Sequence, residues 1–308
     1  MATKNKVTII GAGQVGSTAA YSLVSSGITE EIALIDLNVD LVKAEVMDLQ
    51  HSVPFWGYTK VKVGSYKDVA DSQIAIITCG ARQKEGETRI DLVKKNSAII
   101  KEIVPQIFKA NPNVILIMVT NPVDVLTYQA IKMFPSKKKQ IIGSGTMLDS
   151  ARLRFLLSEK LSINPSSIHA YIVGEHGDSE LPLWSTAAIG NSKLDQFKKL
   201  SQTEKDKIFN QAKNAAYAII AGKQCTNYAI GAGINQLVTA ILYNRHTVLP
   251  VSHLLEGEYG IKDVCLSLPA VVGCKGLEQK LVLEISAQEK KLLKNSADCL
   301  KKINKTIN

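Results

Sequence analysis

The sequence predicts an α/β protein in which a doubly wound parallel sheet is followed by a second, α+β domain. Short β-rich segments alternate with helical stretches through the first half of the chain. Such alternation requires crossover connections, which place parallel strands between two layers of helices. After about Ser144 the alternation stops and mixed elements follow. We therefore expect a first domain over residues 1–143 and a second over residues 144–308.

The predicted strands of the first domain are short apolar runs. They cover residues 7–10, 32–35, 61–63, 74–78, 114–120 and 140–142, with helices in most of the intervals. In the second domain we expect a helix over residues 148–161 and strand-like segments at "IHAYIVG" and "CLSLPAVVG". Two further helices begin at capping boxes, Ser201 with Glu204 and Ser286 with Glu289. No repeat or low-complexity linker separates the domains, so residues from both are expected to form one site.

The composition indicates a soluble globular protein. Hydrophobic residues make up 45% of the 308 residues and charged residues 21%, enough for substantial cores. No apolar targeting segment follows the N-terminal lysines, and no run is long enough to span a bilayer. The cysteines are odd in number and contain no C-x-x-C pair, which argues against a disulfide framework or a zinc site; they are Cys79, Cys225, Cys265, Cys274 and Cys299. We expect a protein of the reducing cytoplasm, with no metal and no membrane partner.

The formal net charge of +9 raises the question of a nucleic-acid partner. The excess lies in "SKKKQ" and near the C-terminus in "EKKLLKNSADCLKKINK", where lysines and apolar residues recur at helical spacing. This pattern is typical of an amphipathic helix with a solvated lysine face. Aromatic residues, at 6%, offer no stacking platform for bases. We therefore expect no nucleic-acid partner, although a positive surface can steer small anions.

The first motif is "GAGQVG", which places Gly11, Gly13 and Gly16 in G-x-G-x-x-G spacing between a predicted strand and a helix. Gly11 permits the tight turn, Gly13 lets the backbone approach a pyrophosphate, and Gly16 allows close packing of helix on strand. Asp36 follows the second predicted strand. Its carboxylate would accept hydrogen bonds from an adenosine ribose and repel a 2′-phosphate. The motif predicts a Rossmann-type domain that binds NAD in preference to NADP.

A second group of residues points to proton transfer. His176 lies in "GEHGD" after an apolar segment, and Asp149 and Arg152 lie three residues apart in "GTMLDSARLR", so both project from one face of a predicted helix. Taken alone, the histidine is as compatible with a turn as with catalysis. A carboxylate beside an imidazole fixes its tautomer and stabilises its protonated form, and a guanidinium grips a carboxylate at two points. Together these groups could move a proton on a bound hydroxy acid.

Five ordered motifs carry a resemblance to a known family. They are "GAGQVGSTAAY", "GARQKEGETR", "VTNPVDVLTY", "GSGTMLDSARLR" and "GEHGDSE". The chain resembles the lactate/malate dehydrogenase family, and within it the bacterial L-lactate dehydrogenases, from about Val7 into the C-terminal helix. The resemblance implies a cytoplasmic homotetramer that transfers hydride between NADH and pyruvate, giving (S)-lactate at the fermentative end of glycolysis.

The resemblance also implies roles for individual residues. His176 would be the general acid/base, Asp149 would orient it, Arg152 would hold the substrate carboxylate, and Arg89 would polarise the substrate carbonyl. The implied substrate-binding residues are Gln83, Arg89, Asn121, Asp124, Arg152 and Thr226. The implied NAD-binding residues are Gly11, Gly13, Val15, Gly16, Asp36, Tyr66, Gly80, Ala81, Val119, Asn121 and Ser144.

Gln83 is the residue expected to select the substrate. In malate dehydrogenases an arginine occupies the matching position and can pair with the second carboxylate of oxaloacetate. Gln83 lacks that charge, and nearby Glu87 would further disfavour a dicarboxylate. Because a buried unpaired carboxylate costs several kcal/mol, in order of magnitude, the site is expected to favour pyruvate. An alternative is that Gln83 is only a solvated loop residue.

Arg154 and His169 suggest regulation. In bacterial lactate dehydrogenases the matching residues line a subunit interface that binds fructose 1,6-bisphosphate. Symmetry would bring two copies of each residue together as a cationic cluster that an anion stabilises. A surface arginine and a structural histidine are the alternative.

Two departures from the family pattern and three rival functions stay open. Leu41 stands where relatives often have a lysine near the adenosine, and Arg82 replaces a common asparagine; they leave cofactor affinity and loop closure in doubt. The chemistry also suits a malate dehydrogenase or a dehydrogenase for bulkier 2-hydroxy acids. A dinucleotide-binding protein without turnover is a more distant possibility, against which the presence of His176, Asp149, Arg152 and Arg89 argues.

Overall fold

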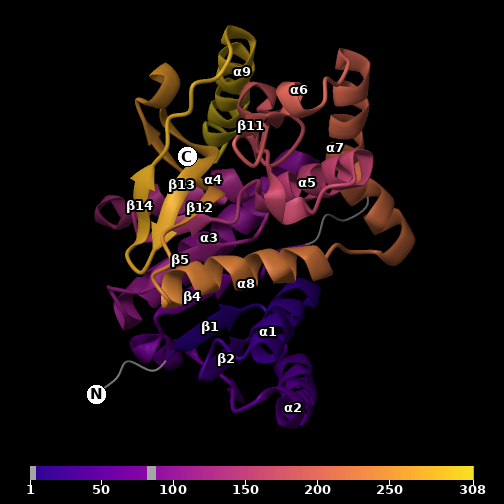
Figure 1. Ribbon diagram of the computed structural model, residues 1–308. Coiled ribbons are helices and arrows are strands. Elements are labelled where there is room, and N and C mark those ends of the chain that lie inside the picture. The colour runs from indigo at the N-terminus through magenta and orange to yellow at the C-terminus, as the bar shows by residue number, and fades with distance from the viewer. Residues whose placement is uncertain (1–4, 82–87, 308) are drawn as a thin grey trace.

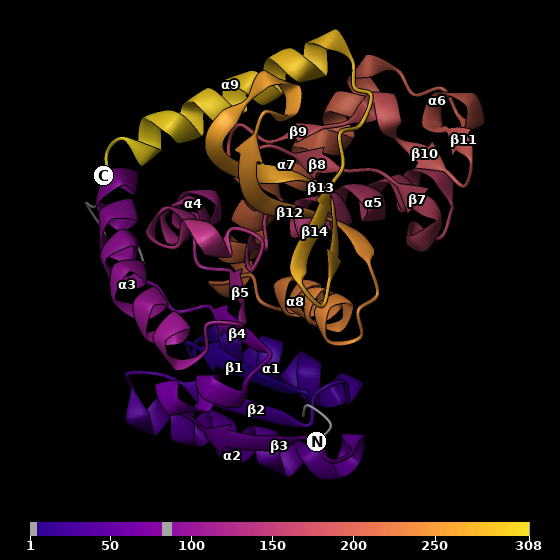
Figure 2. The same ribbon diagram turned by 90° about the vertical axis from the view of Figure 1, so that its left-hand side faces the viewer.

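The computed structural model describes residues 5–81 and 88–307, and one large sheet runs through both halves of the chain. Within the described residues, nine strands are ordered β14-β13-β12-β6-β5-β4-β1-β2-β3. Figure 2 shows this order from β3 at one end, through β1, β4 and β5, to β12–β14 at the other. The parallel strands are β1 Lys6–Ile10, β2 Glu31–Ile35, β3 Lys60–Val63, β4 Ile74–Ile77, β5 Ile115–Met118 and β6 Ile141–Gly143.

Helices cover both faces of this parallel sheet, as the sequence predicts. They are α1 Gln14–Ser26, α2 Val39–Trp56, α3 Arg89–Ala110 and α4 Val123–Met133, with the 3-10 turns η1 Tyr66–Asp71 and η2 Pro135–Lys137. Successive strand residues point to opposite faces. Ile74 and Ile76 of β4 therefore pack with α1, α2 and α8, a helix of the second half at Tyr228–Leu242, whereas Ala75 and Ile77 pack with α3 and α4. Strands buried on both faces explain why most of these runs are predominantly apolar.

The second half of the chain supplies the strands at one end of the sheet, β12–β14, and its helix α8 lies beside α1 (Figure 1). Its helices are α5 Met147–Leu161, α6 Leu194–Phe197, α7 Gln202–Lys223, α8 Tyr228–Leu242 and α9 Ala287–Asn304, with 3-10 turns η3 Pro165–Ser167, η4 Trp184–Thr186 and η5 Glu258–Gly260. Its strands are β7 Ile168–His169, β8 Ile172–Val173, β9 Leu181–Pro182, β10 Ala188–Ile189, β11 Ser192–Lys193, β12 Thr247–Glu256, β13 Lys262–Gly273 and β14 Gly276–Lys280. Thus α+β structure follows the parallel sheet. In the part of the chain that the structure describes, no helix is long and apolar enough to cross a membrane.

Most of the predicted elements are confirmed. The first four predicted strands and the sixth match to within one residue at each end, and the predicted helix over 148–161 is α5. Both capping boxes form, at Ser201 with Glu204 and at Ser286 with Glu289. In α9, Leu293, Ala297 and Leu300 are buried while the lysines stay largely exposed, as an amphipathic helix requires.

Two details differ from the prediction. The strand expected over 114–120 is only Ile115–Met118, because the amides of Val119 and Thr120 both donate to the carbonyl of Ile77 and the ladder ends there. Strand β12 is not among the predicted elements. Pro250 faces Pro269 across the β12–β13 hairpin, and Ser252 joins the hairpin to Gly143 at the edge of the parallel sheet. The sheet therefore extends across the predicted domain boundary.

The parallel strands bring the loops of interest to one edge of the sheet. Gly11 follows β1, Gly80 lies beyond β4, Asn121 lies beyond β5, and Ser144 follows β6. Carboxyl ends of parallel strands share one edge, which is where ligands bind in open α/β sheets. Residues far apart in the sequence thus meet at this edge.

Candidate active site

The glycine loop between β1 and α1 has the shape of an anion-binding turn. Gly11 has φ of 115°, a left-handed conformation that favours glycine. A Cβ at Gly16 would lie 1.9 Å from the carbonyl oxygen of Gly11, whereas a Cβ at Gly13 would meet nothing within 4 Å. Gly13 is the N-cap of α1 and offers no side-chain cap, so among the described residues no N-cap side chain accepts from the first-turn amides. These features fit the pyrophosphate of a dinucleotide.

Asp36 lies beside this loop. Its Oδ2 accepts a hydrogen bond of 2.7 Å from the backbone amide of Ala12, and its Oδ1 accepts one of 2.9 Å from Asn38. The carboxylate is therefore held at the end of β2, next to the turn that the glycines form. Each oxygen keeps a lone pair with which it can accept a hydrogen bond from a ribose hydroxyl.

A buried asparagine joins the next two loops. Asn96 of α3 accepts a hydrogen bond of 2.7 Å from the amide of Ala81 through Oδ1 and donates one of 2.7 Å to the carbonyl of Asn121 through Nδ2. The Asn96 side chain is almost fully buried and lies close to Gly80. It fixes the spacing between two segments that the sequence analysis expects to hold NAD and substrate. Sequence reasoning missed Asn96, because a lone asparagine within a helix carries no motif.

At the centre of the candidate site, one carboxylate holds both an imidazole and a guanidinium. Asp149 Oδ2 lies 2.5 Å from His176 Nδ1, and Asp149 Oδ1 accepts a hydrogen bond of 2.9 Å from Arg152 Nη1. Helix α5 presents Asp149 and Arg152 on one face, and His176 arrives from the loop after β8. The side chain of Asp149 is 3% exposed, that of Arg152 12% and that of His176 25%, so the two cationic groups can reach a ligand.

The electrostatics of this group favour a protonated histidine. Burial lowers the pKa of His176, but the charge and hydrogen bond of Asp149, with the carboxyl groups of Asp124 and Glu180, raise it to about 9. Burial acts to raise the pKa of Asp149, and the charges of His176 and Arg152 bring it below its ordinary value. His176 and Asp149 therefore form an ion pair at neutral pH, with His176 able to donate a proton.

Asp124 lies beneath His176. Its Oδ2 accepts a hydrogen bond of 2.7 Å from the backbone amide of His176, and Asp124 is only 2% exposed. Burial raises the pKa of Asp124 to about 6, although the contacts with Ser252 and His176 oppose the rise. The sequence resemblance implies that Asp124 binds substrate; in the structure its Oδ2 holds the main chain that carries His176.

The other expected site residues are distributed around this edge. Val15 and Val119 are half-buried against the core on the α1 side of the sheet, and Tyr66 is half-buried on the α3 side. Ser144 is buried at the end of β6. Thr226 lies in the short segment between α7 and α8, which is tied to α1 by a hydrogen bond of 2.9 Å from Asn227 to Thr18.

Two expected residues cannot be placed in full. Gln83 lies outside the described residues. Arg89 is the first residue of α3, and its side chain lies outside the described part.

Arg154 and His169 come from neighbouring elements, α5 and β7. Arg154 is half-buried, and burial lowers the pKa of its guanidinium, while Tyr171 opposes this. Among the described residues no carboxylate forms an ion pair with Arg154. His169 is exposed and pairs with Ala188 in a small sheet.

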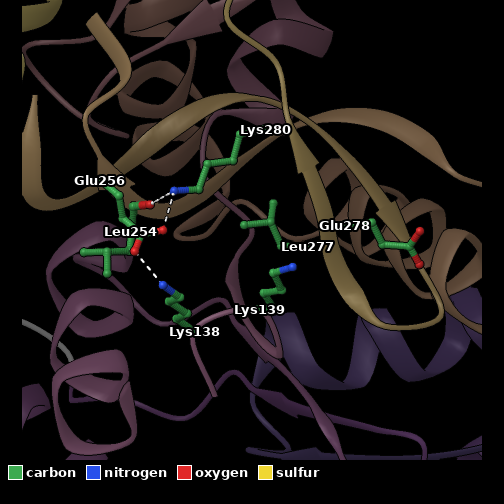
Figure 3. Close-up of a pocket in the computed structure, with 7 residues that line it drawn as sticks. All are labelled: Lys138, Lys139, Leu254, Glu256, Leu277, Glu278 and Lys280. Carbon is green, nitrogen blue, oxygen red and sulfur yellow. Dashed lines mark hydrogen bonds and ion pairs between the residues drawn. The ribbon is translucent and has the colours of Figure 1, made fainter. Parts of the chain in front are cut away.

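Two cavities lie away from the glycine loop. A small one, of about 50 Å³, lies at the seam between β6 and the β12–β14 hairpin, and its Lys138 and Lys280 contact Glu256 at 2.5 and 3.0 Å (Figure 3). These ion pairs hold the seam and leave little charge for a ligand. A larger cavity, of about 530 Å³, lies between α7, α9 and residues 178–185, and Glu180 is one of its lining residues.

Comparisons with known proteins match the whole chain. Residues 5–143 match the NAD-binding domain of the lactate/malate dehydrogenases, and residues 146–308 match the α/β C-terminal domain of that family. An L-lactate dehydrogenase of Acetivibrio thermocellus is 48% identical over 98% of this chain and 97% of its own length. L-lactate dehydrogenase 1 of Clostridium acetobutylicum is 44% identical over 98% of both chains.

Solved structures agree with the sequence relatives. The minor L-lactate dehydrogenase of Enterococcus mundtii, in a ligand-bound form, has a TM-score of 0.96 at 36% identity, with 99% of each chain covered. A lactate dehydrogenase from a deep-sea metagenome of the Medee basin also has a TM-score of 0.96, at 39% identity. The glycine loop, Asp36 and the match to the NAD-binding domain make NAD the cofactor. The chain is an NAD-dependent dehydrogenase and belongs to the lactate/malate dehydrogenase family.

Proposed function

We propose that the protein is an L-lactate dehydrogenase that interconverts pyruvate and (S)-lactate. The observation that carries the proposal is the bridging carboxylate of Asp149, which holds a proton donor, His176, and a carboxylate-binding group, Arg152, side by side. A 2-oxo acid needs both groups, one for its ketone oxygen and one for its carboxylate. The names of the relatives at 43–48% identity support the same substrate pair.

His176 would move the proton. Nδ1 is engaged with Asp149, which leaves Nε2 to donate to the ketone oxygen during reduction and to accept the hydroxyl proton during oxidation. Bound NADH supplies the hydride. The positions of Gly11, Gly13 and Asp36 support a role in holding NAD, with Gly13 leaving space for the pyrophosphate. Because reduction needs protonated His176, kcat/KM for pyruvate is expected to fall as pH rises through about 9.

Arg152 would bind the substrate carboxylate. A guanidinium has five N–H donors, and one of its nitrogens already donates to Asp149. The remaining donors can form a two-point contact with the carboxylate, which places the ketone beside His176. Asp149 would hold both His176 and Arg152 and thereby fix their positions relative to each other.

The test of the proposed function is a comparison of substrates. NADH oxidation is measured by absorbance with pyruvate, oxaloacetate and a branched 2-oxo acid, and kcat/KM is determined for each. A clear preference for pyruvate supports the proposal. A preference for oxaloacetate would make the enzyme a malate dehydrogenase, and absence of turnover with all three would leave a dinucleotide-binding protein.

Replacing Asp36 with serine is expected to weaken NADH binding about tenfold to a hundredfold, since a charged hydrogen-bond acceptor is lost. The affinity for NADPH should rise relative to NADH, because the carboxylate no longer repels a 2′-phosphate. Quenching of protein fluorescence measures both dissociation constants. Asp40→Asn, an exposed change in the first turn of α2, is the matched control and should change neither. An unaltered ratio of the two constants in Asp36→Ser would show that the ribose is recognised elsewhere.

We further propose that fructose 1,6-bisphosphate activates the enzyme at an interface of a cytoplasmic homotetramer. Support comes from the half-buried Arg154, which forms no ion pair within the described residues, and from His169 on the adjacent β7. A second copy related by symmetry would double this positive charge, and a bisphosphate would offset it. The five cysteines are free, which suits a reducing compartment.

Fructose 1,6-bisphosphate is accordingly expected to lower the KM for pyruvate at least severalfold, and Arg154→Gln should abolish that response while leaving the unactivated rate near its original value. Initial rates at neutral pH and physiological salt, with and without the effector, measure the effect. Arg245→Gln, a change of the same kind far along the chain, is the control. Identical pyruvate saturation curves with and without effector would remove the claim.

A further inference from the structure

Glu180 is a buried acidic residue that the proposed reaction does not use. It closes the segment "GEHGDSE" and is only 7% exposed. Its backbone amide donates to the carbonyl of Gly177, so the segment folds back toward His176. Its Oε1 is buried and has no hydrogen-bond partner among the described residues. A buried carboxyl oxygen without a partner is costly and therefore calls for an explanation.

Glu180 lies beside the catalytic pair. Carboxylate oxygens of Asp149 and Glu180 and a ring nitrogen of His176 all lie within 4.8 Å of one another. This spacing is also compatible with metal ligands. However, Asp149 already gives one oxygen to His176 and the other to Arg152, and the guanidinium would repel a cation. The cluster is better explained as an electrostatic one.

The charges around Glu180 keep it neutral at neutral pH. Burial and the charge of Asp149 raise the pKa of Glu180, and His176, Lys213 and Arg152 oppose them; the result is a pKa of about 8. The ion pairs at neutral pH thus consist of Asp149 between two cations, His176 and Arg152. A substrate carboxylate supplies the second negative charge, and an ionised Glu180 would add a third. The neutral form therefore suits a site that must admit an anion.

Glu180 is one of the residues that line the larger cavity. Figure 2 shows β8 and β9 among α5, α7 and α9, and the cavity of about 530 Å³ occupies this region. The charged residues facing this cavity are Asp178, Asp195, Lys205, Asp206 and Glu289. Lys205 is paired with Asp195, and Glu289 with Ser185 and Ser286.

We propose that Glu180 is a positioning residue that acts through Asp149 and His176. As a neutral acid Glu180 adds no negative charge near the substrate carboxylate. As an anion it helps His176 to keep its proton, and it thereby sets the alkaline limit of pyruvate reduction, that is, the pH above which kcat/KM for pyruvate falls. This inference rests on the proposed function, because the limit is defined for a reaction that consumes the His176 proton. Glu180 does not itself contact the reacting atoms.

The first test is the pH profile of kcat/KM for pyruvate in Glu180→Gln. Below the alkaline limb the variant should stay within about threefold of the parent, because glutamine mimics the neutral acid. The midpoint of the alkaline limb should fall by about one pH unit. At a fixed pH above the midpoint of the parent, this shift lowers kcat/KM for pyruvate about tenfold. Glu180→Asp, which keeps an ionisable group, should restore part of the shift. A limb that coincides with that of the parent, or a loss that is equal at every pH, would overturn the proposal.

Asp206→Asn is the matched control, because Asp206 is on α7 and lines the same cavity. Within the described residues, its side chain accepts a hydrogen bond from Gln202 and forms no ion pair. It removes one carboxylate charge from the cavity wall and should leave the limb in place. A shift of equal size in Asp206→Asn would mean that general surface charge, and not Glu180, sets the limit.

The second test needs no turnover. The titration of the His176 ring is followed by NMR with ring-labelled histidine, and its signal among the five histidines is assigned as the one missing from His176→Asn. We expect the titration midpoint of His176 to be lower in Glu180→Gln than in the parent, and intermediate in Glu180→Asp. If the glutamine variant does not fold, the aspartate variant provides the comparison with the parent. If the parent does not reduce pyruvate yet the midpoint moves, the proposed function fails and the coupling stands. If the parent reduces pyruvate and the midpoint is unchanged, the coupling fails.

Discussion

Replacing Asp149 with asparagine is expected to lower kcat/KM for pyruvate by about a thousandfold or more. The carboxylate lies 2.5 Å from His176 Nδ1 and accepts from Arg152 through its other oxygen, so one change affects the proton donor and the carboxylate-binding group together. A neutral amide can still accept a hydrogen bond, but it cannot offset the charge of either cation. Binding of the ketone and the rate of proton transfer should both suffer.

The same variant should change the pH dependence in a defined direction. Asp149 is the main group that raises the pKa of His176 to about 9 against the effect of burial. Without the Asp149 carboxylate the pKa of His176 falls, so His176 loses its proton at a lower pH. The alkaline limb of pyruvate reduction should therefore move toward neutral pH, and the residual activity should be greatest in acid.

The control is Glu159→Gln, an exposed change on the same helix α5. It removes one negative charge from α5 at a distance from His176 and should leave kcat/KM within about twofold, as surface changes usually do. A loss of less than tenfold in Asp149→Asn, with an unchanged alkaline limb, would show that Asp149 does not control the protonation of His176.

The parts of the fold that sequence predicts well are those in which local pattern and global packing agree. The runs at β1, β2 and β4 are mostly apolar and almost fully buried because both sheet faces are covered, and the boxes at Ser201 and Ser286 are local by nature. Strand β12 escapes prediction because its identity depends on a partner, β13, whose Pro269 faces Pro250. Nothing in ten residues of sequence specifies that pairing.

The same distinction holds for the candidate site. His176, Asp149 and Arg152 belong to motifs, and the spacing of Asp149 and Arg152 fixes their common face without any tertiary information. Asn96 belongs to no motif, and Glu180 lies within "GEHGDSE" but the motif assigns it no role. Each is recognised through contacts made after folding, to Ala81 and Asn121 in one case and to the Asp149–His176 pair in the other. For Asp124, sequence resemblance indicates the region and the structure adds the direction of the side chain, toward the His176 amide.

Replacing Gln83 with arginine is expected to raise the ratio of kcat/KM for oxaloacetate to that for pyruvate by about a thousandfold or more, which would invert the preference. The described part of the site explains why one charge has so large an effect. Arg152 serves the first carboxylate of any 2-oxo acid, and His176 is surrounded by three carboxyl groups, Asp149, Asp124 and Glu180. Among the described residues, the cations His176 and Arg152 already share the carboxylate of Asp149, so a second substrate carboxylate would meet no unengaged positive group there.

A positive group opposite the second carboxylate reverses this balance, whereas for pyruvate the same group would face a methyl and lose its own hydration without gaining a partner. Gln83→Met is therefore the informative control: it alters the shape at the same position without adding charge, and it should leave oxaloacetate as poor a substrate as before. Steady-state kinetics with both acids measure the ratio in all three proteins. If arginine leaves the ratio unchanged, selection by charge does not occur at residue 83. The segment around Thr226, which the family resemblance implies binds substrate, then becomes the place where the two acids are distinguished.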